Sequence, residues 1–525
     1  MRIEQCSRLA AIFALVGCSN ASLLGISADV DPQEPSSSEL TSLPPTAAYA
    51  PRATSVISGT AQEHTWMRRP SLGDVDGDGF DDFVVEASWN DDVSLEYGNR
   101  AYLFYGRADL PAQLSTADAD AVLEAGELPA TALGDINGDG FSDFALGDHT
   151  GFEIVFGSST RLSGEHKRFT TGLAWYPPTV SEQFWYLRPL GDVDGDNKAE
   201  LIVTVMSDVP DSEIANRVSE LITEYVIAGR SDGWPSGMWD PSWAVAMLGD
   251  DAPSFEDNGL STVLQRLASA GRGDLDGDGY ADLLALGRWR LWVFYGSERG
   301  FHGTLTPAQA DASLSWPYDA TARRGEFAKT IPFIVGDING DGAADIGVPK
   351  QAELGLVYGI QRRWSGRVEL LPELTVVRAS AEAPETSWWL PLADDPSYSA
   401  PLPEVVSTQV RVGVADLNGD GERELVLHET RYPEFETPLV TALYTLTGPG
   451  KSATGRYVLT DANSYHAVGV SDTTAALSRG TLLDQGGDFD GDGCTDLIFG
   501  VVDDPRYLDT RASLHLVPGL PRPPD

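Results

Sequence analysis

Short apolar runs alternate with acidic, glycine-rich segments along most of this chain. The runs that directly follow the acidic segments are rich in β-branched and aromatic residues, as at 83–85, 201–205, 425–427 and 497–499. A second apolar run, ending in glycine, follows most of these, at 101–106, 154–157, 291–296 and 356–359. Such short runs bounded by turn residues are typical of buried strands and are too short for helices. The pattern therefore predicts an all-β fold in which acidic loops connect neighbouring strands.

The acidic segments are copies of one nine-residue pattern, D-x-[DN]-G-D-G-x-x-[DE]. Side chains that carry oxygen recur at positions 1, 3, 5 and 9, and glycine recurs at positions 4 and 6. Seven copies occur, which we call loops 1 to 7: 74–82, 135–143, 192–200, 274–282, 337–345, 416–424 and 488–496. Loop 3 departs most, with Asn197 at position 6 and Glu200 at position 9, and loop 6 has Glu424 at position 9. Copies at this domain-scale spacing indicate a repeat protein with one loop in each repeat.

The oxygen pattern of the loops suits a calcium ion. Ca²⁺ is a hard cation that takes about 6–8 oxygen ligands, and glycines at positions 4 and 6 permit the sharp course that wraps a loop around it. We expect the position 7 carbonyl to be a ligand too, which leaves the position 7 side chain free to vary. Up to seven Ca²⁺ ions are predicted. The predicted ligands are Asp74, Asp76, Asp78, Phe80, Asp82, Asp135, Asn137, Asp139, Phe141, Asp143, Asp192, Asp194, Asp196, Lys198, Glu200, Asp274, Asp276, Asp278, Tyr280, Asp282, Asp337, Asn339, Asp341, Ala343, Asp345, Asp416, Asn418, Asp420, Glu422, Glu424, Asp488, Asp490, Asp492, Cys494 and Asp496.

Two other interpretations of the loops fit less well. An EF-hand needs a glutamate at position 12 and helices on both sides. Position 12 is apolar in every copy, at Val85, Leu146, Val203, Ala285, Val348, Leu427 and Phe499. An ordinary Asp-Gly hairpin turn that binds nothing would explain one copy, but not seven copies with the same oxygen positions. The calcium interpretation is therefore favoured.

Each repeat contains a strand, a loop, a second strand, a turn and a third strand, with room for a fourth. Units of this size predict a seven-bladed β-propeller over residues 51–521, because propellers have about 4–8 blades of several short strands. The repeats resemble FG-GAP/VCBS repeats, the blades of the integrin α-subunit propeller, and the D-x-[DN]-G-D-G core carries that resemblance. The resemblance implies metal ligands at the positions named above. Integrins carry the loop in only some blades, and nothing here resembles their other domains, so it implies no partner.

The ends of the repeat region suggest how a propeller would close. Only two apolar runs follow loop 7, and the run 53–57 precedes the first repeat without a partner of its own. We expect 53–57 to pair into the last blade, which would remove an exposed strand edge.

The N-terminus predicts export. Residues 1–17 read as a secretory signal, with a basic start and an apolar core that is too short to span a bilayer. The boundary Leu15-Val-Gly-Cys18 resembles a bacterial lipobox, which implies that Cys18 is lipidated. The alternative is an ordinary signal peptide with a chance cysteine. Residues 18–50 are predicted to form a flexible tether, so we expect a lipid-anchored, extracytoplasmic protein at the outer membrane or cell surface of a bacterium.

The net charge and the cysteine content limit the classes of binding partner and the disulfides that we expect. The net charge is −43, and loop positions 1, 3, 5 and 9 hold 25 of the 79 acidic side chains, so seven Ca²⁺ ions would leave −29. A chain this acidic repels nucleic acid and anionic lipid head groups, so we expect no nucleic-acid partner and a membrane contact through the lipid anchor alone. If Cys6 leaves with the signal and Cys18 carries lipid, Cys494 has no cysteine to pair with.

The expected function is a monomeric binding or adhesion module for a protein or glycan ligand, without enzymatic activity. Neither G-x-S-x-G nor H-E-x-x-H occurs. Two alternatives stay open: an enzyme such as a hydrolase with an axial site, and a structural envelope protein. Stretches 182–260 and 361–410 lengthen the spacing and are expected to carry specific binding. Trp234, Trp239 and Trp243 could stack on a sugar, although packing between blades is the commoner use.

Overall fold

The computed structural model describes residues 55–58, 63–65, 71–90, 97–126, 128–177, 182–210, 218–249, 264–265, 268–286, 290–316, 332–350, 353–359, 363–378, 386–389, 407–421, 423–432, 440–446, 455–459, 464–465, 486–502, 512–517 and 519. The predicted signal, the lipidation site Cys18 and the tether lie outside these residues, as does Glu422 of loop 6. The described part is all-β apart from two single-turn 3₁₀ helices, η1 (Thr116–Asp118) and η2 (Pro241–Trp243), which confirms the predicted fold class. No helix among these residues is both long and apolar enough to cross a membrane.

The strands of the described residues form seven sheets of four to six strands, named here after the loop that each carries. Sheet 1 contains β2 (Glu63–Thr65), β3 (Ser71–Gly73), β4 (Asp82–Asn90), β5 (Tyr97–Phe104), β7 (Ala121–Ala125) and, at its outer edge, β11 (Gly164–His166). Sheet 2 contains β8 (Leu128–Gly134), β9 (Asp143–Asp148), β10 (Gly151–Val155), β12 (Leu173–Tyr176) and β16 (Gly237–Met238). Sheet 3 contains β13 (Glu182–Gly191), β14 (Glu200–Pro210), β15 (Val218–Ile227), β17 (Ala246–Leu248), β22 (Gly303–Leu305) and β18 (Leu264–Gln265).

The remaining four sheets repeat this plan. Sheet 4 contains β19 (Ala268–Gly273), β20 (Asp282–Leu286), β21 (Leu291–Phe294), β23 (Ala312–Ser315) and β27 (Gly366–Glu369). Sheet 5 contains β24 (Phe333–Gly336), β25 (Asp345–Lys350), β26 (Glu353–Val357), β28 (Leu374–Arg378) and β33 (Gly455–Leu459). Sheet 6 contains β29 (Thr386–Trp389), β30 (Ser407–Ala415), β31 (Glu424–Tyr432), β32 (Val440–Leu446) and β34 (Ser464–Tyr465). Sheet 7 contains β35 (Leu497–Val502), β36 (Ala512–Val517), β1 (Ser55–Ser58) and β6 (Gln113–Ser115).

Neighbouring repeats share strands at their outer edges. Within sheets 1 to 5, successive strands of one repeat pair in antiparallel fashion, and a short strand from the following repeat then adds in parallel at the outer edge, as β11 does on β7. An exposed strand edge is a template for unwanted pairing, and this extra strand covers it. The arrangement also links each repeat to the next.

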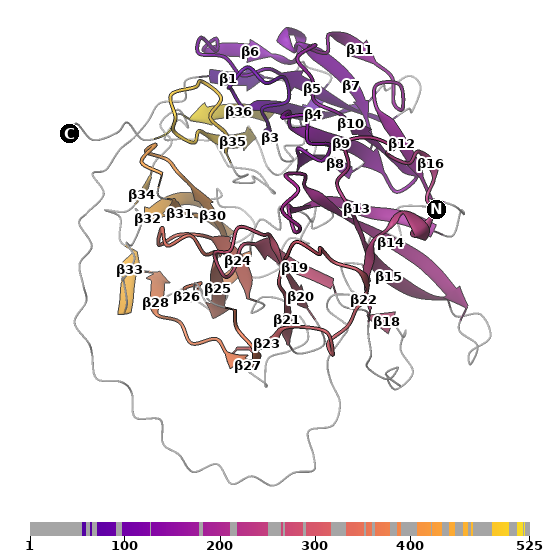
Figure 1. Cartoon of the computed structure of the whole chain (residues 1–525). Coiled ribbons are helices and arrows are strands. Elements are labelled where there is room, and N and C mark those ends of the chain that lie inside the picture. The colour runs from indigo at the N-terminus through magenta and orange to yellow at the C-terminus, as the bar shows by residue number, and fades with distance from the viewer. Residues whose placement is uncertain are drawn as a thin grey trace.

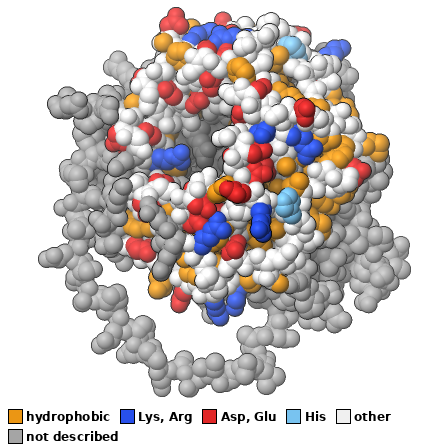
Figure 2. Space-filling model, in the orientation of Figure 1, with side chains coloured by type: hydrophobic (Ala, Val, Ile, Leu, Met, Phe, Trp, Pro, Cys, Tyr) orange, Lys and Arg blue, Asp and Glu red, His pale blue; other side chains and the backbone are white. Residues whose placement is uncertain are grey.

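The N-terminal strand completes the last sheet. Strand β1 pairs antiparallel with β36, with Ser55 opposite Leu516, and β6 of the first repeat pairs in parallel with the other edge of β1. The predicted closure by the run at 53–57 is thus confirmed, with the strand at Ser55–Ser58. The sheets follow one another around a common centre (Figure 1), which is hollow in the space-filling view (Figure 2). This is the architecture of a β-propeller.

The apolar core lies between successive sheets rather than inside one layer. In β4, Phe83 and Val85 pack with Phe489 of the seventh repeat, whereas Val84 packs with Phe144 of sheet 2. Phe83 lies 5.2 Å from Phe489, ring centroid to ring centroid, in an edge-to-face arrangement. A strand with both faces covered reads as a continuous apolar run, which explains why the sequence shows little alternation.

The tryptophans of the stretch 182–260 belong to this core. Trp239 is buried between sheets 2 and 3 beside Trp175, with ring centroids 5.8 Å apart. Trp234 and Trp243 are partly buried against the same cluster. Their packing use is therefore confirmed. Part of the stretch expected to form a binding insertion is instead regular structure, because β14 and β15 are long paired strands.

Candidate metal centres

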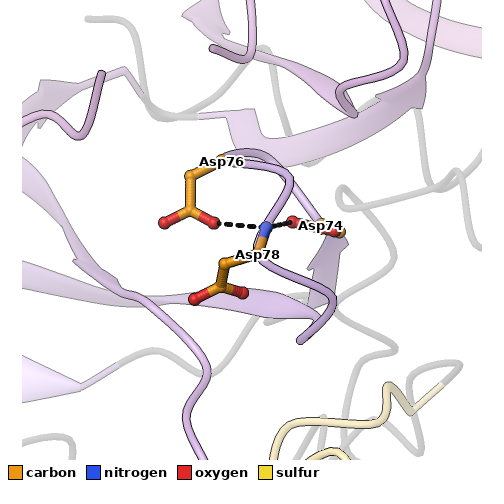
Figure 3. A group of neighbouring side chains, drawn as sticks. All are labelled: Asp74, Asp76 and Asp78. Atoms are coloured by element: carbon orange, nitrogen blue, oxygen red, sulfur yellow. Dashed lines mark hydrogen bonds between the residues drawn. The ribbon is translucent and has the colours of Figure 1, made fainter. Parts of the chain in front are cut away.

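The carboxylate at position 1 organises each loop. In loop 1, Oδ1 of Asp74 accepts hydrogen bonds from the backbone N–H groups of Gly77 (2.6 Å) and Asp78 (3.2 Å), and Oδ2 accepts one from Gly79 (3.0 Å). Figure 3 shows Asp74 and Asp76 both directed at the N–H of Asp78. The bond from the position 6 N–H to the position 1 carboxylate occurs in all seven loops, at 2.7–3.0 Å. The first aspartate therefore fixes the same backbone curl in every repeat.

Positions 4 and 6 require glycine for different structural reasons. Both have positive φ, 76° at Gly77 and 93° at Gly79. A Cβ built on Gly79 meets nothing within 4 Å, whereas one on Gly77 would lie 2.5 Å from the ring of Phe141. Position 6 therefore needs only the left-handed conformation, which asparagine tolerates. Asn197 adopts it in loop 3 with φ of 62° and makes the usual bond to Asp192, at 2.8 Å, so the irregular loop keeps the common geometry.

The position 9 carboxylate pins the loop to two strands. Its oxygens accept the position 2 N–H in all seven loops, at 2.7–3.0 Å. In loops 1 to 5 and 7 they also accept the N–H of the glycine that follows the third strand, such as Gly106, at 2.8–3.2 Å. Sequence analysis predicted these carboxylates as ligands but missed this bridging role. The recurrent glycine after the third strand is the signal that could have revealed it.

Burial makes these carboxylates hard to ionise in the absence of a cation. Asp82 is 0% exposed, and this desolvation raises its pKa to about 8 despite its two backbone hydrogen bonds. The same cause raises the pKa of Asp282 and of Glu200 to about 7. A bound cation would favour the charged form of each group.

Glutamate at position 9 is accommodated without loss of the bridge to the loop. Glu200 accepts the N–H of Val193 (2.8 Å) and of Gly229 (3.2 Å), as aspartate does in other loops. Glu424 accepts the N–H of Leu417 (2.7 Å), but its second oxygen accepts from Nδ2 of Asn418 (2.9 Å). The substitution therefore changes local contacts in loop 6 more than in loop 3.

Backbone hydrogen bonds also join loops of neighbouring repeats. The position 8 N–H of a loop donates to the position 1 carbonyl of the preceding loop, as from Ser142 to Asp74 at 2.8 Å. Equivalent bonds join loops 2 and 3, 3 and 4, 4 and 5, and 6 and 7, at 2.6–2.9 Å. The series closes from Asp81 of loop 1 to the carbonyl of Asp488 in loop 7, at 2.9 Å, and Oδ2 of Asp81 accepts the N–H of Asp488 at 3.0 Å.

The position 7 side chain differs from loop to loop, as expected from the sequence, but it also has a packing role that the sequence did not predict. It lies against the position 4 glycine of the preceding loop, as Phe141 does on Gly77 and Tyr280 on Gly195. Cys494 occupies the same place against Gly419, where it is buried, and it is the only cysteine among the described residues. Burial raises the pKa of its thiol to about 12. The sequence could not show this role, because the contact joins two loops that lie far apart along the chain.

The structure brings the predicted ligands together in four loops. Three carboxylates offer oxygens within 4.8 Å of one another at positions 1, 3 and 5 of loops 1 and 7, and at positions 1, 3 and 9 of loops 3 and 4. Loops 2, 5 and 6 have asparagine at position 3, and no such group of acids is found there among the described residues. Burial and the neighbouring Asp492 raise the pKa of Asp490, so loop 7 also favours a cation.

One orphaned oxygen supports the fit to a cation. Oδ1 of Asp488 is buried and has no hydrogen-bond partner among the described residues. It belongs to the acidic group of loop 7 with Asp490 and Asp492. A buried carboxylate oxygen without a donor is costly, and a hard cation would satisfy it. The all-oxygen donor set fits calcium.

Basic side chains outside the loop pattern also reach the loops. Arg161 bridges Asp76 and Asp78 of loop 1, and Arg363 bridges Asp276 and Asp278 of loop 4. Sequence analysis did not single them out. Both stand four residues after the glycine that follows a third strand, Gly157 or Gly359, and that shared offset is the signal that could have found them.

Comparison with known families agrees with the repeat interpretation. Residues 274–348, which span loops 4 and 5, match the FG-GAP-like repeat family. No curated protein sequence matches the chain. The resemblance seen in the sequence is thus confirmed: the chain carries an FG-GAP-like repeat.

Solved structures give only distant likenesses. One is a lectin of Agrocybe aegerita described as recognising non-reducing terminal N-acetylglucosamine, 14% identical, with 86% of this chain and 91% of that chain covered at a TM-score of 0.34. Another is BBS1N in complex with ARL6DN, 9% identical, with 92% and 98% covered, also at 0.34. Scores this low leave the fold to rest on the sheets and loops themselves.

Proposed function

We propose that this protein is a calcium-binding, seven-bladed β-propeller that acts as a binding or adhesion module for a protein or glycan ligand. The observation that carries the proposal is the set of equivalent acidic loops, in which backbone hydrogen bonds join loops 1 to 5 in series, join loop 6 to loop 7, and close from loop 7 back to loop 1. Each of the seven sheets would then be one blade with its own calcium loop.

Calcium would be held by the oxygens at positions 1, 3, 5 and 9 and by the position 7 carbonyl. The ion would supply positive charge where three or four acidic side chains gather at short range. Positions 1 and 9 are already fixed by backbone N–H groups, so the ligands are preorganised before the ion arrives. The ion would therefore stabilise the loops and the contacts between blades.

The binding role follows from the scaffold. A rigid ring of blades presents its connecting loops on two faces, and recognition residues are usually carried by such loops. We further propose that the module is a monomer without enzymatic activity, tethered to the outer membrane or cell surface of a bacterium through a lipid on Cys18.

Metal analysis and ligand arrays test the proposal together. Protein at equilibrium dialysis against millimolar Ca²⁺ should hold several equivalents of calcium above the surrounding buffer by elemental analysis, and EDTA should remove them. Glycan and protein arrays probed in Ca²⁺ should give hits that vanish in EDTA. No excess calcium on the protein at equilibrium would overturn the metal assignment, and turnover of a hydrolase substrate would favour an axial enzyme site.

A further inference from the structure

Two arginines contact the predicted metal ligands in the same way. Nε and Nη2 of Arg363 lie 2.7 Å and 2.6 Å from Oδ2 of Asp276 and Oδ2 of Asp278. Arg161 makes the equivalent pair of contacts to Oδ2 of Asp76 and of Asp78. We call Arg161 and Arg363 the loop-bridging arginines. Each comes from the repeat that follows its loop, so the contact also joins neighbouring repeats.

A tyrosine holds each loop-bridging arginine in place. The guanidinium of Arg161 lies 4.7 Å from the ring centre of Tyr105, and that of Arg363 lies 5.0 Å from Tyr295. The hydroxyl of each tyrosine accepts the N–H of the residue after the arginine, at 2.8 Å for Leu162 and 2.6 Å for Trp364. The same set of contacts thus occurs twice, three repeats apart, which indicates a built feature rather than a chance surface pair.

The arginines occupy the oxygens that a metal would need. In loop 4, Oδ1 of Asp276 accepts the N–H of Asp278 (3.2 Å), and Oδ1 of Asp278 accepts that of Tyr280 (3.1 Å). The Oδ2 atoms of these two residues are the ones that bond to Arg363. A cation that used the same Oδ2 atoms would meet the guanidinium directly, and like charges at this range repel.

The acidic loops differ in how much of their negative charge is balanced by a neighbouring basic side chain. Loops 1, 3, 4 and 7 each have four acidic side chains at ligand positions, and loops 2, 5 and 6 each have three. Loops 1 and 4 have an arginine, and in loop 3 Nζ of Lys198 lies 2.8 Å from Oδ2 of Asp196. No ion pair to loop 7 is found among the described residues, and Oδ1 of Asp488 in that loop has no partner there.

We propose that Arg161 and Arg363 are resident counter-cations that hold loops 1 and 4 in shape without a metal and weaken their calcium affinity relative to loop 7. The inference rests on the proposed calcium function and adds a ranking of the sites. Loops 1 and 4 keep their geometry when calcium is scarce, and loop 7 fills first. Both arginine side chains are nearly half exposed, so solvent reduces the effect without removing it.

Charge removal at the two arginines tests the inference. In EDTA, the Arg161→Gln/Arg363→Gln double variant should melt below the wild type, because the carboxylates of loops 1 and 4 lose their counter-charge. In saturating Ca²⁺ the deficit should shrink or reverse, because the ion no longer competes with a guanidinium. Calorimetric titration should show two sites tightened about tenfold, the scale expected for removing one like charge near a partly exposed ion.

Matched variants distinguish a failure of this inference from a failure of the proposed function. Arg367→Gln removes the same charge from an exposed position on the outer strand β27 and should change neither measurement. Arg161→Lys keeps the charge but cannot bridge both carboxylates with a planar fork, so it should fall between wild type and Arg161→Gln. A wild type that binds no calcium would overturn the proposed function. Calcium binding left unchanged by the double variant, or a melting deficit of equal size with and without Ca²⁺, would overturn this inference alone.

Discussion

The two glycines of each loop show how one residue type serves two physical needs. At position 6 a glycine is required only by the backbone, and Asn197 meets that need in loop 3. At position 4 the glycine also makes room for the next loop, because Phe141 lies where a Cβ on Gly77 would be. Position 4 therefore couples each loop to its neighbour, which position 6 does not.

Alanine at these two positions should have unequal costs. Gly79→Ala should destabilise the protein by about 1–2 kcal/mol, the cost of a left-handed conformation at a residue with a Cβ. Gly77→Ala should cost more, because the added Cβ also clashes with the Phe141 ring. Denaturant unfolding in EDTA would measure both without the influence of metal. The Phe141→Ala change should relieve part of the Gly77→Ala penalty, and equal costs for the two single variants would contradict the assigned role.

The ligand residues of the loops could be predicted because their geometry is local. Nine consecutive residues contain the position 1, 3, 5 and 9 oxygens, and the hydrogen bonds within each loop span at most seven residues, as from Val75 to Asp82. The partners of Gly77 and Asp78, namely Phe141 and Arg161, come from the next repeat. No local pattern encodes such pairs, so the position 7 packing and the loop-bridging arginines became visible only in three dimensions.

At the scale of single elements, β1 is the strand that joins the first and last repeats. It supplies one strand to sheet 7 although it lies at the start of the described chain, and Ile57 is buried in the cluster between sheets 7 and 1. Its neighbours β36 and β6 come from opposite ends of the repeat region. Loss of this strand would leave the edge of β36 uncovered.

Truncation of Ile57 should open the ring locally. Ile57→Ala should cost about 2–5 kcal/mol, the usual range for a buried isoleucine. Ile154→Ala in the interior strand β10 is a matched control, because that side chain is also fully buried. Only Ile57→Ala should speed amide exchange in β36, with an opening free energy smaller than that of global unfolding. The reason is that β36 can be uncovered without unfolding the other sheets. Equal exchange in the two variants would show that closure depends little on β1.

The main strands could be predicted from sequence, but the edge strands could not. Strands such as β4 and β20 are covered on both faces, so their continuous apolar runs stand out. Strand β11 has only three residues, and two of them are exposed. It pairs with β7 through the backbone, which requires no apolar pattern. Sequence periodicity carries no signal for such an element.

At the scale of the whole molecule, buried carboxylates and ring closure act together. Burial raises the pKa of Asp82 and Asp496 to about 8 and that of Asp143, Asp345 and Glu424 to about 7. A folded-state pKa above the unfolded value near 4 means that the folded protein binds these protons more tightly. The stabilisation is full below about pH 4 and is lost as the pH rises through 7 to 8. Without metal, the protein should therefore become less stable across this window.

Calcium should reverse that loss, and this is the broadest test of the ring. Extracellular calcium modules bind with Kd of about 10⁻⁴–10⁻³ M, so at roughly millimolar Ca²⁺ each site adds about 0.4–1.4 kcal/mol by mass action. Seven independent sites would add about 3–10 kcal/mol, which is comparable to the whole net stability of a typical domain.

EDTA should therefore lower the melting temperature strongly at pH 8 and much less at pH 5, where the buried carboxyls hold protons instead of an ion. Melting curves recorded at both pH values, with and without Ca²⁺, measure how calcium binding and protonation of the buried carboxyls together set the stability. A calcium effect of the same size at pH 5 and pH 8 would show that the buried position 9 carboxylates take no part in binding, and an absent effect at both would remove the metal from the loops.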